Sequence, residues 1–108
     1  MADEQTYIDE DGRTVHRTGY PHIVKVDGLR SGRPVIESTG YEVQHIVGYY
    51  YKVGMSVEQI AAEWDYLPLP AIFSALAYYH DHREEIDRVR YESSYEYWQA
   101  QQPVKAGV

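Results

Sequence analysis

The sequence predicts a mainly helical domain with a small β part at its amino-terminal end. Three observations lead to this fold class. A capping box opens a short helix at Ser56, prolines at positions 68 and 70 separate that helix from a longer one, and short β-type segments with Asp-Gly turns precede both. A short helix followed by a long one at a tight corner is typical of a homeodomain-like, three-helix helix-turn-helix. The chain of 108 residues is long enough for one such domain with one modest core.

The amino-terminal part predicts two β-hairpins. Each has apolar segments on both sides of an Asp-Gly turn, at Asp11-Gly12 and at Asp27-Gly28, and Asp-Gly favours the positive dihedral angles that hairpin turns require. The strand segments are residues 6–8, 14–16, 23–26 and 34–37. Such short ribbons rarely stand alone in water. We therefore expect them to pack on the helices or to pair with a second copy of the chain, and we expect a homodimer.

Apolar stripes at helical spacing predict the first two helices. The first stripe consists of Val43, Ile46, Val47 and Tyr50. It ends at Gly54, which suits the carboxyl-terminal cap of a helix. The second helix begins at Ser56, whose side chain is expected to accept a hydrogen bond from the Gln59 amide while the Gln59 side chain reaches back. Its stripe, at i, i+3, i+4 and i+7, consists of Val57, Ile60, Ala61 and Trp64.

The third helix is expected to begin near Pro70, because proline at a first helical position loses no hydrogen bond. Its inward side is expected to consist of Ile72, Phe73, Leu76, Tyr79 and the stem of Arg83. The pattern continues through Ile86 and Val89, so residues 82–90 are expected to extend this helix. With Leu76 at the inward centre, the outward residues are Ala71, Ser74, Tyr78, Asp81 and His82.

The formal net charge of −7 is distributed unevenly along the chain. Residues 12–54 carry six bases and three acids, whereas both flanking regions are strongly acidic. Phosphate neutralisation needs concentrated Lys and Arg, so DNA binding is expected to be weak, salt-dependent and assisted by the basic region. We expect phosphate contacts from Arg33 and Lys52, and groove contacts from Ser74 and Tyr78.

Four segments in a fixed order carry a family resemblance: Tyr20-Pro21-His22-Ile23, Ser31-Gly32-Arg33-Pro34-Val35-Ile36, Gly54-Met55-Ser56-Val57-Glu58-Gln59-Ile60 and Ile72-Phe73-Ser74-Ala75-Leu76-Ala77-Tyr78-Tyr79. Together they resemble the domain of unknown function 433 family over about residues 20–86. The resemblance implies a homeodomain-like domain with a small amino-terminal β element. It also implies a VapB-type antitoxin that is paired with a PIN-like ribonuclease toxin.

The chain departs from the usual residues of that family at two places. Ser38-Thr39-Gly40-Tyr41 stands where the family usually has Gly-Thr-Arg-Ile, which removes an arginine before the first helix. Asp65-Tyr66 stands where Tyr-Pro usually precedes the leucine of the corner. A DNA contact made by that arginine is therefore not expected in this chain.

The segment from Tyr91 to Trp98 is unusually aromatic. Aromatic side chains are enriched at interface hot spots, which favours partner binding, although the same rings would also suit packing on the domain itself. The residues expected to bind a partner are Tyr91, Glu92, Tyr95, Glu96, Tyr97 and Trp98. The chain thus divides into an amino-terminal arm with a hairpin (1–19), a helix-turn-helix domain with a leading hairpin (20–90) and a tail (91–108).

No pattern in the sequence favours catalysis, a metal or a cofactor. His80 and His82 are two residues apart, which places them about 200° from each other around a helix. Asp9-Glu10-Asp11-Gly12 lacks the third alternate oxygen ligand and the final glutamate of a calcium loop, and is expected to be a hairpin turn. The absence of cysteine, of a long apolar run and of a basic start leads us to expect a cytoplasmic protein without a membrane span.

We expect a DNA-binding, antitoxin-like regulator, in line with the family resemblance. Its expected partners are a PIN-like ribonuclease toxin, which it would neutralise, and the DNA of its own operon, which it would repress. The alternative is a protein-protein interaction module of helix-turn-helix fold with little DNA affinity. This alternative stays open because none of the outward residues expected on the third helix is Lys or Arg. An enzyme is not expected.

Overall fold

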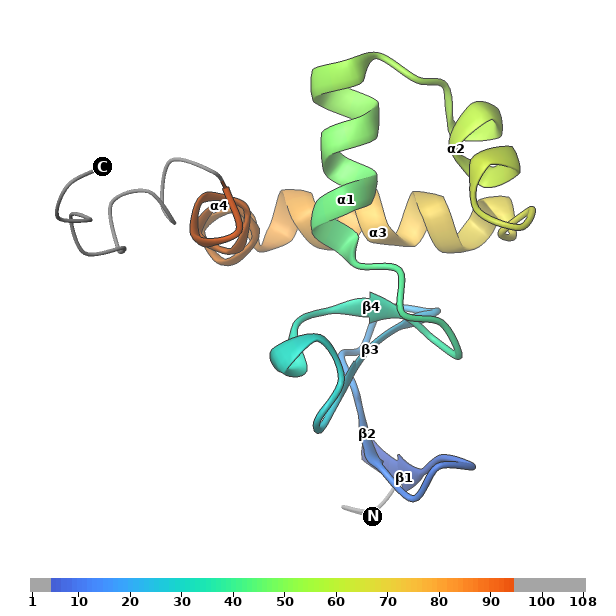
Figure 1. Ribbon diagram of the computed structural model, residues 1–108, viewed down its shortest axis with the longest axis vertical. Coiled ribbons are helices and arrows are strands. Elements are labelled where there is room, and N and C mark those ends of the chain that lie inside the picture. Colours follow the sequence, from blue (N-terminus) through green and yellow to red (C-terminus); the bar gives the residue numbers. More distant parts are fainter. Residues whose placement is uncertain (1–4, 95–108) are drawn as a thin grey trace, which may run out of the picture.

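The structure, a computed structural model, describes residues 5–94 and confirms the predicted fold class (Figure 1). A four-stranded antiparallel sheet precedes four helices. The strands are β1 (Thr6–Ile8), β2 (Thr14–Arg17), β3 (Ile23–Val26) and β4 (Val35–Ile36). The helices are α1 (Val43–Gly48), α2 (Val57–Glu63), α3 (Leu69–Asp81) and α4 (Arg83–Glu92). Among these described helices, none is long and apolar enough to cross a membrane.

Both predicted hairpins are present, and they join into one sheet in the order β1-β2-β3-β4. β2 pairs with β3 so that Val15 lies opposite Val26, which links the two hairpins. The first turn is held by Asp9, whose carboxylate accepts hydrogen bonds from the backbone amides of Asp11 and Arg13, both at 2.9 Å. The prediction of a hairpin turn at this place is confirmed.

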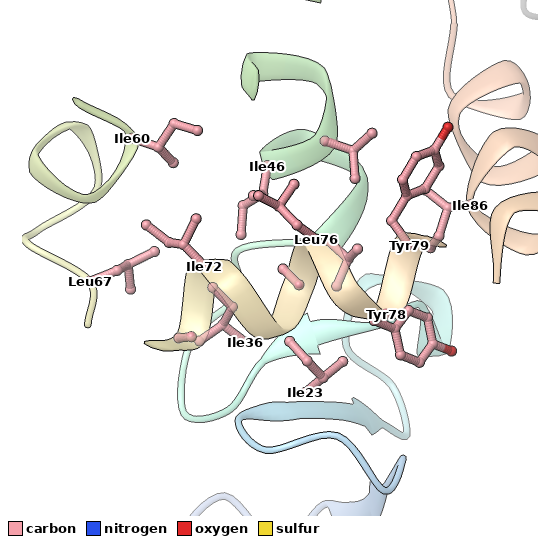
Figure 2. Close-up of a cluster of buried hydrophobic side chains, with 14 of the residues drawn as sticks. Ile23, Ile36, Ile46, Ile60, Leu67, Ile72, Leu76, Tyr78, Tyr79 and Ile86 are labelled. Carbon is pink, nitrogen blue, oxygen red and sulfur yellow. The ribbon is translucent and has the colours of Figure 1, made fainter. Parts of the chain in front are cut away.

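The two faces of the sheet bury different apolar clusters, because side chains alternate along each strand. On one face, Ile23 and Ile36 enter the main core with the helices, as Figure 2 shows. The opposite face carries a second cluster, made of Val15, Val24, Val26 and Val35. Figure 1 shows the sheet below α3, with the β1–β2 ribbon pointing away from the helices. The hairpins therefore pack on the helical part through β3 and β4.

The helices of the helix-turn-helix begin and end close to the predicted residues. α1 continues through a π-helical turn, Tyr49–Val53, and stops at Gly54, whose φ of 87° is left-handed and favours glycine. α2 opens with the predicted capping box: the Gln59 amide donates to the Ser56 hydroxyl at 3.1 Å, and the Ser56 amide donates to the Gln59 side-chain oxygen at 2.8 Å. α3 has Pro70 in its first turn, as predicted.

Replacing Ser56 by alanine is expected to destabilise the protein by about 1 kcal/mol, because the change removes the side-chain acceptor for the Gln59 amide. For a domain of this size, that loss corresponds to a melting temperature lower by about 4–8 °C in thermal unfolding. Ser56→Asp is the matched control, because aspartate is also a good cap and should keep the wild-type melting temperature. Equal losses in both variants would contradict the capping role.

α3 is buried on two sides. Ile72 and Leu76 pack toward α1 and α2, while Tyr78, only 2% exposed, lies on the side of the sheet. Figure 2 shows core side chains above α3, toward α1, and below it, toward the sheet. The prediction that Ala71 and Tyr78 point outward is wrong, and so is the prediction that Phe73 faces inward. The prediction allowed for one buried side, whereas the sheet covers a second one.

The predicted continuation of the third helix through residue 90 is wrong. The chain leaves helical geometry at His82, with φ of −134° and ψ of 45°. The His82 ring stacks on the Tyr78 ring with centroids 4.1 Å apart, and its Nδ1 lies 3.0 Å from the Tyr78 carbonyl oxygen. α4 then starts in a new direction, so that Ile86 is fully buried in the same core. Tyr79 donates a hydrogen bond to Asp87 at 3.0 Å, which holds α4 against α3.

Candidate interaction surfaces

The corner between α2 and α3 is built around Trp64. The Trp64 indole stacks on the Tyr41 ring, with centroids 4.9 Å apart and planes inclined by 9°, and meets the Tyr49 ring edge-on at 5.1 Å. Leu67 follows in a buried position, and its amide donates to the Ala61 carbonyl at 3.1 Å. These contacts tie the corner to the residues just before α1 and just after it.

Asp65 and Tyr66 form the corner itself, and both have left-handed backbone angles, with φ of 58° and 56°. Such angles are strained for residues other than glycine and persist only where neighbouring contacts hold them. One such contact is a hydrogen bond that Tyr41 donates to the Asp65 carboxylate at 2.9 Å, and this bond raises the pKa of the Tyr41 hydroxyl. The bond joins the segment just before α1 to the corner before α3.

The outward side of α3 carries a mainly apolar stripe. It consists of Leu69, Phe73, Ala77 and His80, all exposed, and is called the α3 stripe. These residues recur at intervals of four, four and three positions, so they share one side of the helix. At the carboxyl-terminal end of the stripe, His80 Nε2 lies 2.6 Å from the Tyr51 hydroxyl oxygen. At the other end, Tyr66 is 82% exposed in the corner before α3.

The segment that contains α2 and α3 has acids but no strong bases. Between Lys52 and Arg83 the chain contains no Lys or Arg. The acids of this segment, all exposed, are Glu58, Glu63, Asp65 and Asp81. Proteins that read DNA contact phosphates and base edges largely with Arg, Lys, Asn and Gln. The surface on which a helix-turn-helix would hold DNA is therefore acidic and apolar in this protein.

Arg33, which the sequence assigns to phosphate contact, is held by Glu42. Its Nε and one Nη atom donate to the two Glu42 carboxylate oxygens at 2.7 and 3.2 Å. The Glu42 side chain is almost fully buried, and Gln44 donates a further hydrogen bond to it at 2.7 Å. Burial raises the pKa of Glu42, but these hydrogen bonds and the arginine charge outweigh burial, so the pKa is lowered. The charge of Arg33 is therefore compensated within the protein.

The other three predicted DNA contacts lie in separate places. Lys52 is exposed in the turn after α1, at the opposite end of that helix from Arg33. Ser74 is half-buried on α3. Tyr78 is buried, and its hydroxyl donates a hydrogen bond to Glu85 at 2.7 Å. The structure does not bring the four residues together on one face.

Two further bases of the basic region differ in their surroundings. Lys25 on β3 pairs with Glu85 on α4 at 3.0 Å, so its charge is compensated where the sheet meets the helices. Arg30 donates to the Gly40 backbone carbonyl at 3.0 Å, and this contact leaves its positive charge uncompensated. The net positive charge of residues 12–54 is thus less available to DNA than the sequence suggests.

Of the residues expected to bind a partner, Tyr91 and Glu92 form the exposed end of α4. Tyr91 lines a hollow between the end of α1 and α4, together with Lys52 and Arg90. The other residues assigned to partner binding lie outside the described part of the chain: Tyr95, Glu96, Tyr97 and Trp98. The aromatic segment therefore starts at this hollow.

The α3 stripe was not predicted from the sequence, because Phe73 was expected to lie in the core. Two signals could have indicated the stripe. Leu69 and Phe73 are four residues apart on a side of the helix that differs from the stripe through Ile72 and Leu76. The lack of Lys and Arg around these residues also indicates that this side does not face DNA.

These features define a small helix-turn-helix protein with an amino-terminal antiparallel sheet. The family model described as Protein of unknown function (DUF433) matches residues 23–79, from the start of β3 almost to the end of α3. The match covers more than half of the chain, and the chain belongs to this family. The resemblance carried by the four sequence segments is confirmed. No curated protein and no solved structure was found to match the chain.

Proposed function

We propose that this chain is a protein-interaction module of helix-turn-helix fold that has little DNA affinity of its own and serves as an antitoxin-like regulator. The observation that carries the proposal is the absence of Lys and Arg between Lys52 and Arg83, over the whole of α2 and α3. DNA affinity depends on cations that neutralise phosphates and release counterions. The exposed acids of this segment would instead repel phosphates, whereas a protein partner imposes no such condition.

The proposed partner is a PIN-like ribonuclease, the kind of toxin with which the resembling antitoxins are paired. A nuclease binds a polyanion, so its cleft is expected to be cationic, and an acidic protein complements such a cleft. Two features of this chain suit that partner: the exposed acids of α2 and α3, and the aromatic and acidic segment from Tyr91 to Trp98. The net charge of −7 would also accelerate association with a cationic protein.

A DNA-binding regulator of its own operon is the second candidate. Arg30 and Lys52 favour it, because both are exposed and Arg30 meets a carbonyl rather than a carboxylate. A two-fold homodimer would present these bases twice. β1 offers an edge for such a dimer, since in the described part of the chain it pairs only with β2, and Ile8 at its end is 62% exposed.

Fluorescence anisotropy with a labelled duplex from the region upstream of its own gene tests the proposal. We expect weak binding, with a dissociation constant of about 10⁻⁴ to 10⁻⁶ M at physiological salt, as is typical of non-specific contacts. Replacing Lys52 by glutamine should flatten the salt slope by about one unit, whereas Ser74→Ala should change nothing. Nanomolar binding that is lost in Ser74→Ala would contradict the proposal and favour the second candidate.

A further inference from the structure

A second hollow between α1 and the end of α4 gathers basic side chains. It shares Lys52 and Arg90 with the hollow that Tyr91 lines, its volume is about 390 Å³, and it is called the α1–α4 hollow. Figure 1 shows α4 beside α1, and the two helices are in contact. His45 and Ser93 also line the hollow. Among the described residues, no Asp or Glu lines it, so its charged lining is entirely basic.

The sequence places these groups on one side of α1. His45, Gly48 and Lys52 are spaced by three and four positions, so they share one side of the helix and of its π-helical turn. Gly48 leaves room there for a side chain from α4, because a β-carbon at this position would lie only 2.9 Å from Arg90 Nη1. The missing side chain therefore lets the Arg90 guanidinium lie on α1, over the turn between His45 and Lys52.

The cations of the hollow are not neutralised by carboxylates. Arg90 donates to the Gln44 backbone carbonyl at 3.4 Å, and within residues 5–94 neither Lys52 nor Arg90 forms an ion pair. The Ser93 hydroxyl accepts a hydrogen bond from the Gln44 side chain at 3.3 Å, so its own proton can be donated elsewhere. The hollow therefore offers an ammonium, a guanidinium and a hydroxyl to an anion.

The pKa of His45 indicates a positive potential at the hollow. Burial is the largest cause that lowers this pKa, and the charges of nearby arginines lower it further, whereas Glu42 raises it. The arginines are Arg30, Arg33 and Arg90. An anion bound beside the imidazole would oppose this shift.

The negative charges near the hollow are engaged elsewhere or are partial. Asp87 lines the neighbouring hollow and accepts the hydrogen bond from Tyr79. Glu42 is held by Arg33, and Glu92 also interacts with Arg33. The carboxyl-terminal ends of α1 and α4 each carry about half a negative charge. The two full positive charges that line the hollow exceed these two partial charges, so the balance in the hollow favours an anion.

We propose that the α1–α4 hollow binds a phosphate group, supplied by a small phosphate ester such as a nucleotide or by free phosphate. Lys52 and Arg90 would neutralise its charge, and His45 and Ser93 would donate hydrogen bonds to its remaining oxygens. A tetrahedral phosphate fits better than a planar carboxylate, because it offers more oxygens to donors that come from two helices. The inference does not depend on the proposed function, since the ligand is a small anion and not a protein.

The remainder of the hollow suits the organic part of a phosphate ester. Tyr49 and Val53 line it beside the basic groups, and Val53 is 65% exposed. Small-molecule sites have volumes of about 300–1,000 Å³ and combine apolar walls with a few polar groups. The α1–α4 hollow has both properties, at the small end of that range.

The test uses the full-length protein in a chloride buffer with three probes: adenosine monophosphate, adenosine and inorganic phosphate. Nuclear magnetic resonance follows the imidazole signals of His45. His16 is the internal control, because it lies on β2 and pairs with Asp27. Adenosine monophosphate is expected to shift the His45 signals and to raise the pKa of His45, whereas adenosine should change neither. A tighter response to the ester than to inorganic phosphate identifies an ester as the ligand, and an equal response identifies free phosphate.

Two variants test the residues of the site. Lys52→Gln is expected to weaken binding of the phosphate probes by at least about tenfold, because it removes a charge-assisted contact. Arg88→Gln is the matched control: it removes the same charge from α4, but Arg88 does not line the hollow. In Gly48→Ala the added methyl group would push the Arg90 guanidinium off α1, while alanine favours the helix. This variant should bind more weakly without a lower melting temperature.

Four results would overturn the proposal. They are His45 signals that do not respond to either phosphate probe, an equal response to adenosine and its monophosphate, equal losses in Lys52→Gln and Arg88→Gln, and full affinity in Gly48→Ala. The first result is also the one expected if the carboxylate of Glu96, two residues beyond Ser94, occupies the hollow in place of a phosphate.

Discussion

Replacing Arg33 by methionine is expected to lower the free energy of unfolding by about 3 kcal/mol at neutral pH, near the lower end for a broken buried ion pair because Arg33 is partly exposed. The change leaves the Glu42 carboxylate almost fully buried without its cationic partner, and Gln44 remains as a neutral donor. Small domains are stable by only about 5–15 kcal/mol, so the loss is a large part of the total. Urea unfolding followed by circular dichroism measures it.

Glu42→Gln in the Arg33→Met background is the matched control, because it removes the buried charge and should restore much of the stability. Acid pH gives a second check. The fold lowers the pKa of Glu42, so the pair contributes stability above the ordinary glutamate pKa and loses it as pH falls through the lowered value. Without Arg33, burial should raise this pKa, so the difference in stability between variant and wild type should shrink as the pH falls through the raised pKa of the variant toward the lowered pKa of the wild type. If the difference in unfolding free energy between the Arg33→Met variant and the wild type stays constant with pH, the buried Glu42 charge is not the cause.

Truncation after Ser94 is expected to abolish binding of the proposed PIN-like ribonuclease partner, measured by co-purification, while the fold stays intact. The cut keeps the described contacts of α4, including the hydrogen bond that Gln44 donates to the Ser93 hydroxyl at 3.3 Å. It removes the rings of Tyr95, Tyr97 and Trp98. A fully buried large side chain contributes roughly 1.5–3 kcal/mol, so losing these rings should weaken binding by about a hundredfold or more.

The matched variant keeps the full chain and replaces Tyr95, Tyr97 and Trp98 by serine, so that the length and the acids of the tail are unchanged. It should lose the ribonuclease as the truncated protein does. Thermal unfolding of both variants completes the test. If either variant melts more than about 5 °C below the wild type, the rings pack on the domain itself and the assignment of this segment to partner binding is wrong.

Local signals explain why the helix-turn-helix could be predicted from the sequence. The capping box at Ser56, the glycine cap at Gly54 and the proline at position 70 each act over a few residues. The Asp-Gly turn at Asp11-Gly12 is equally local, and so is the hairpin that it closes. The absence of Lys and Arg from α2 and α3 is also visible in the sequence alone. The low positive charge of this surface could therefore be predicted without the fold.

Contacts between distant segments explain why the rest could not be predicted. The helical pattern alone places Tyr78 on the outward side of α3. In the fold this side is covered, because the Tyr78 ring packs against Tyr20, which lies just before β3. No proline or glycine marks the break at His82, which depends on how its ring meets Tyr78. From the sequence alone, Arg33 is expected to be free to contact a phosphate. Only the fold shows that it donates a hydrogen bond to Glu42.

The hydrogen bond between Tyr41 and Asp65 couples two segments that are distant in the sequence. The bond joins the segment before α1 to the corner before α3, and side chains in contact contribute non-additively to stability. Replacing either residue alone leaves the other without this partner, next to a corner whose backbone holds left-handed angles. The two side chains therefore form one unit of the corner, whose stability is not the sum of two independent residues.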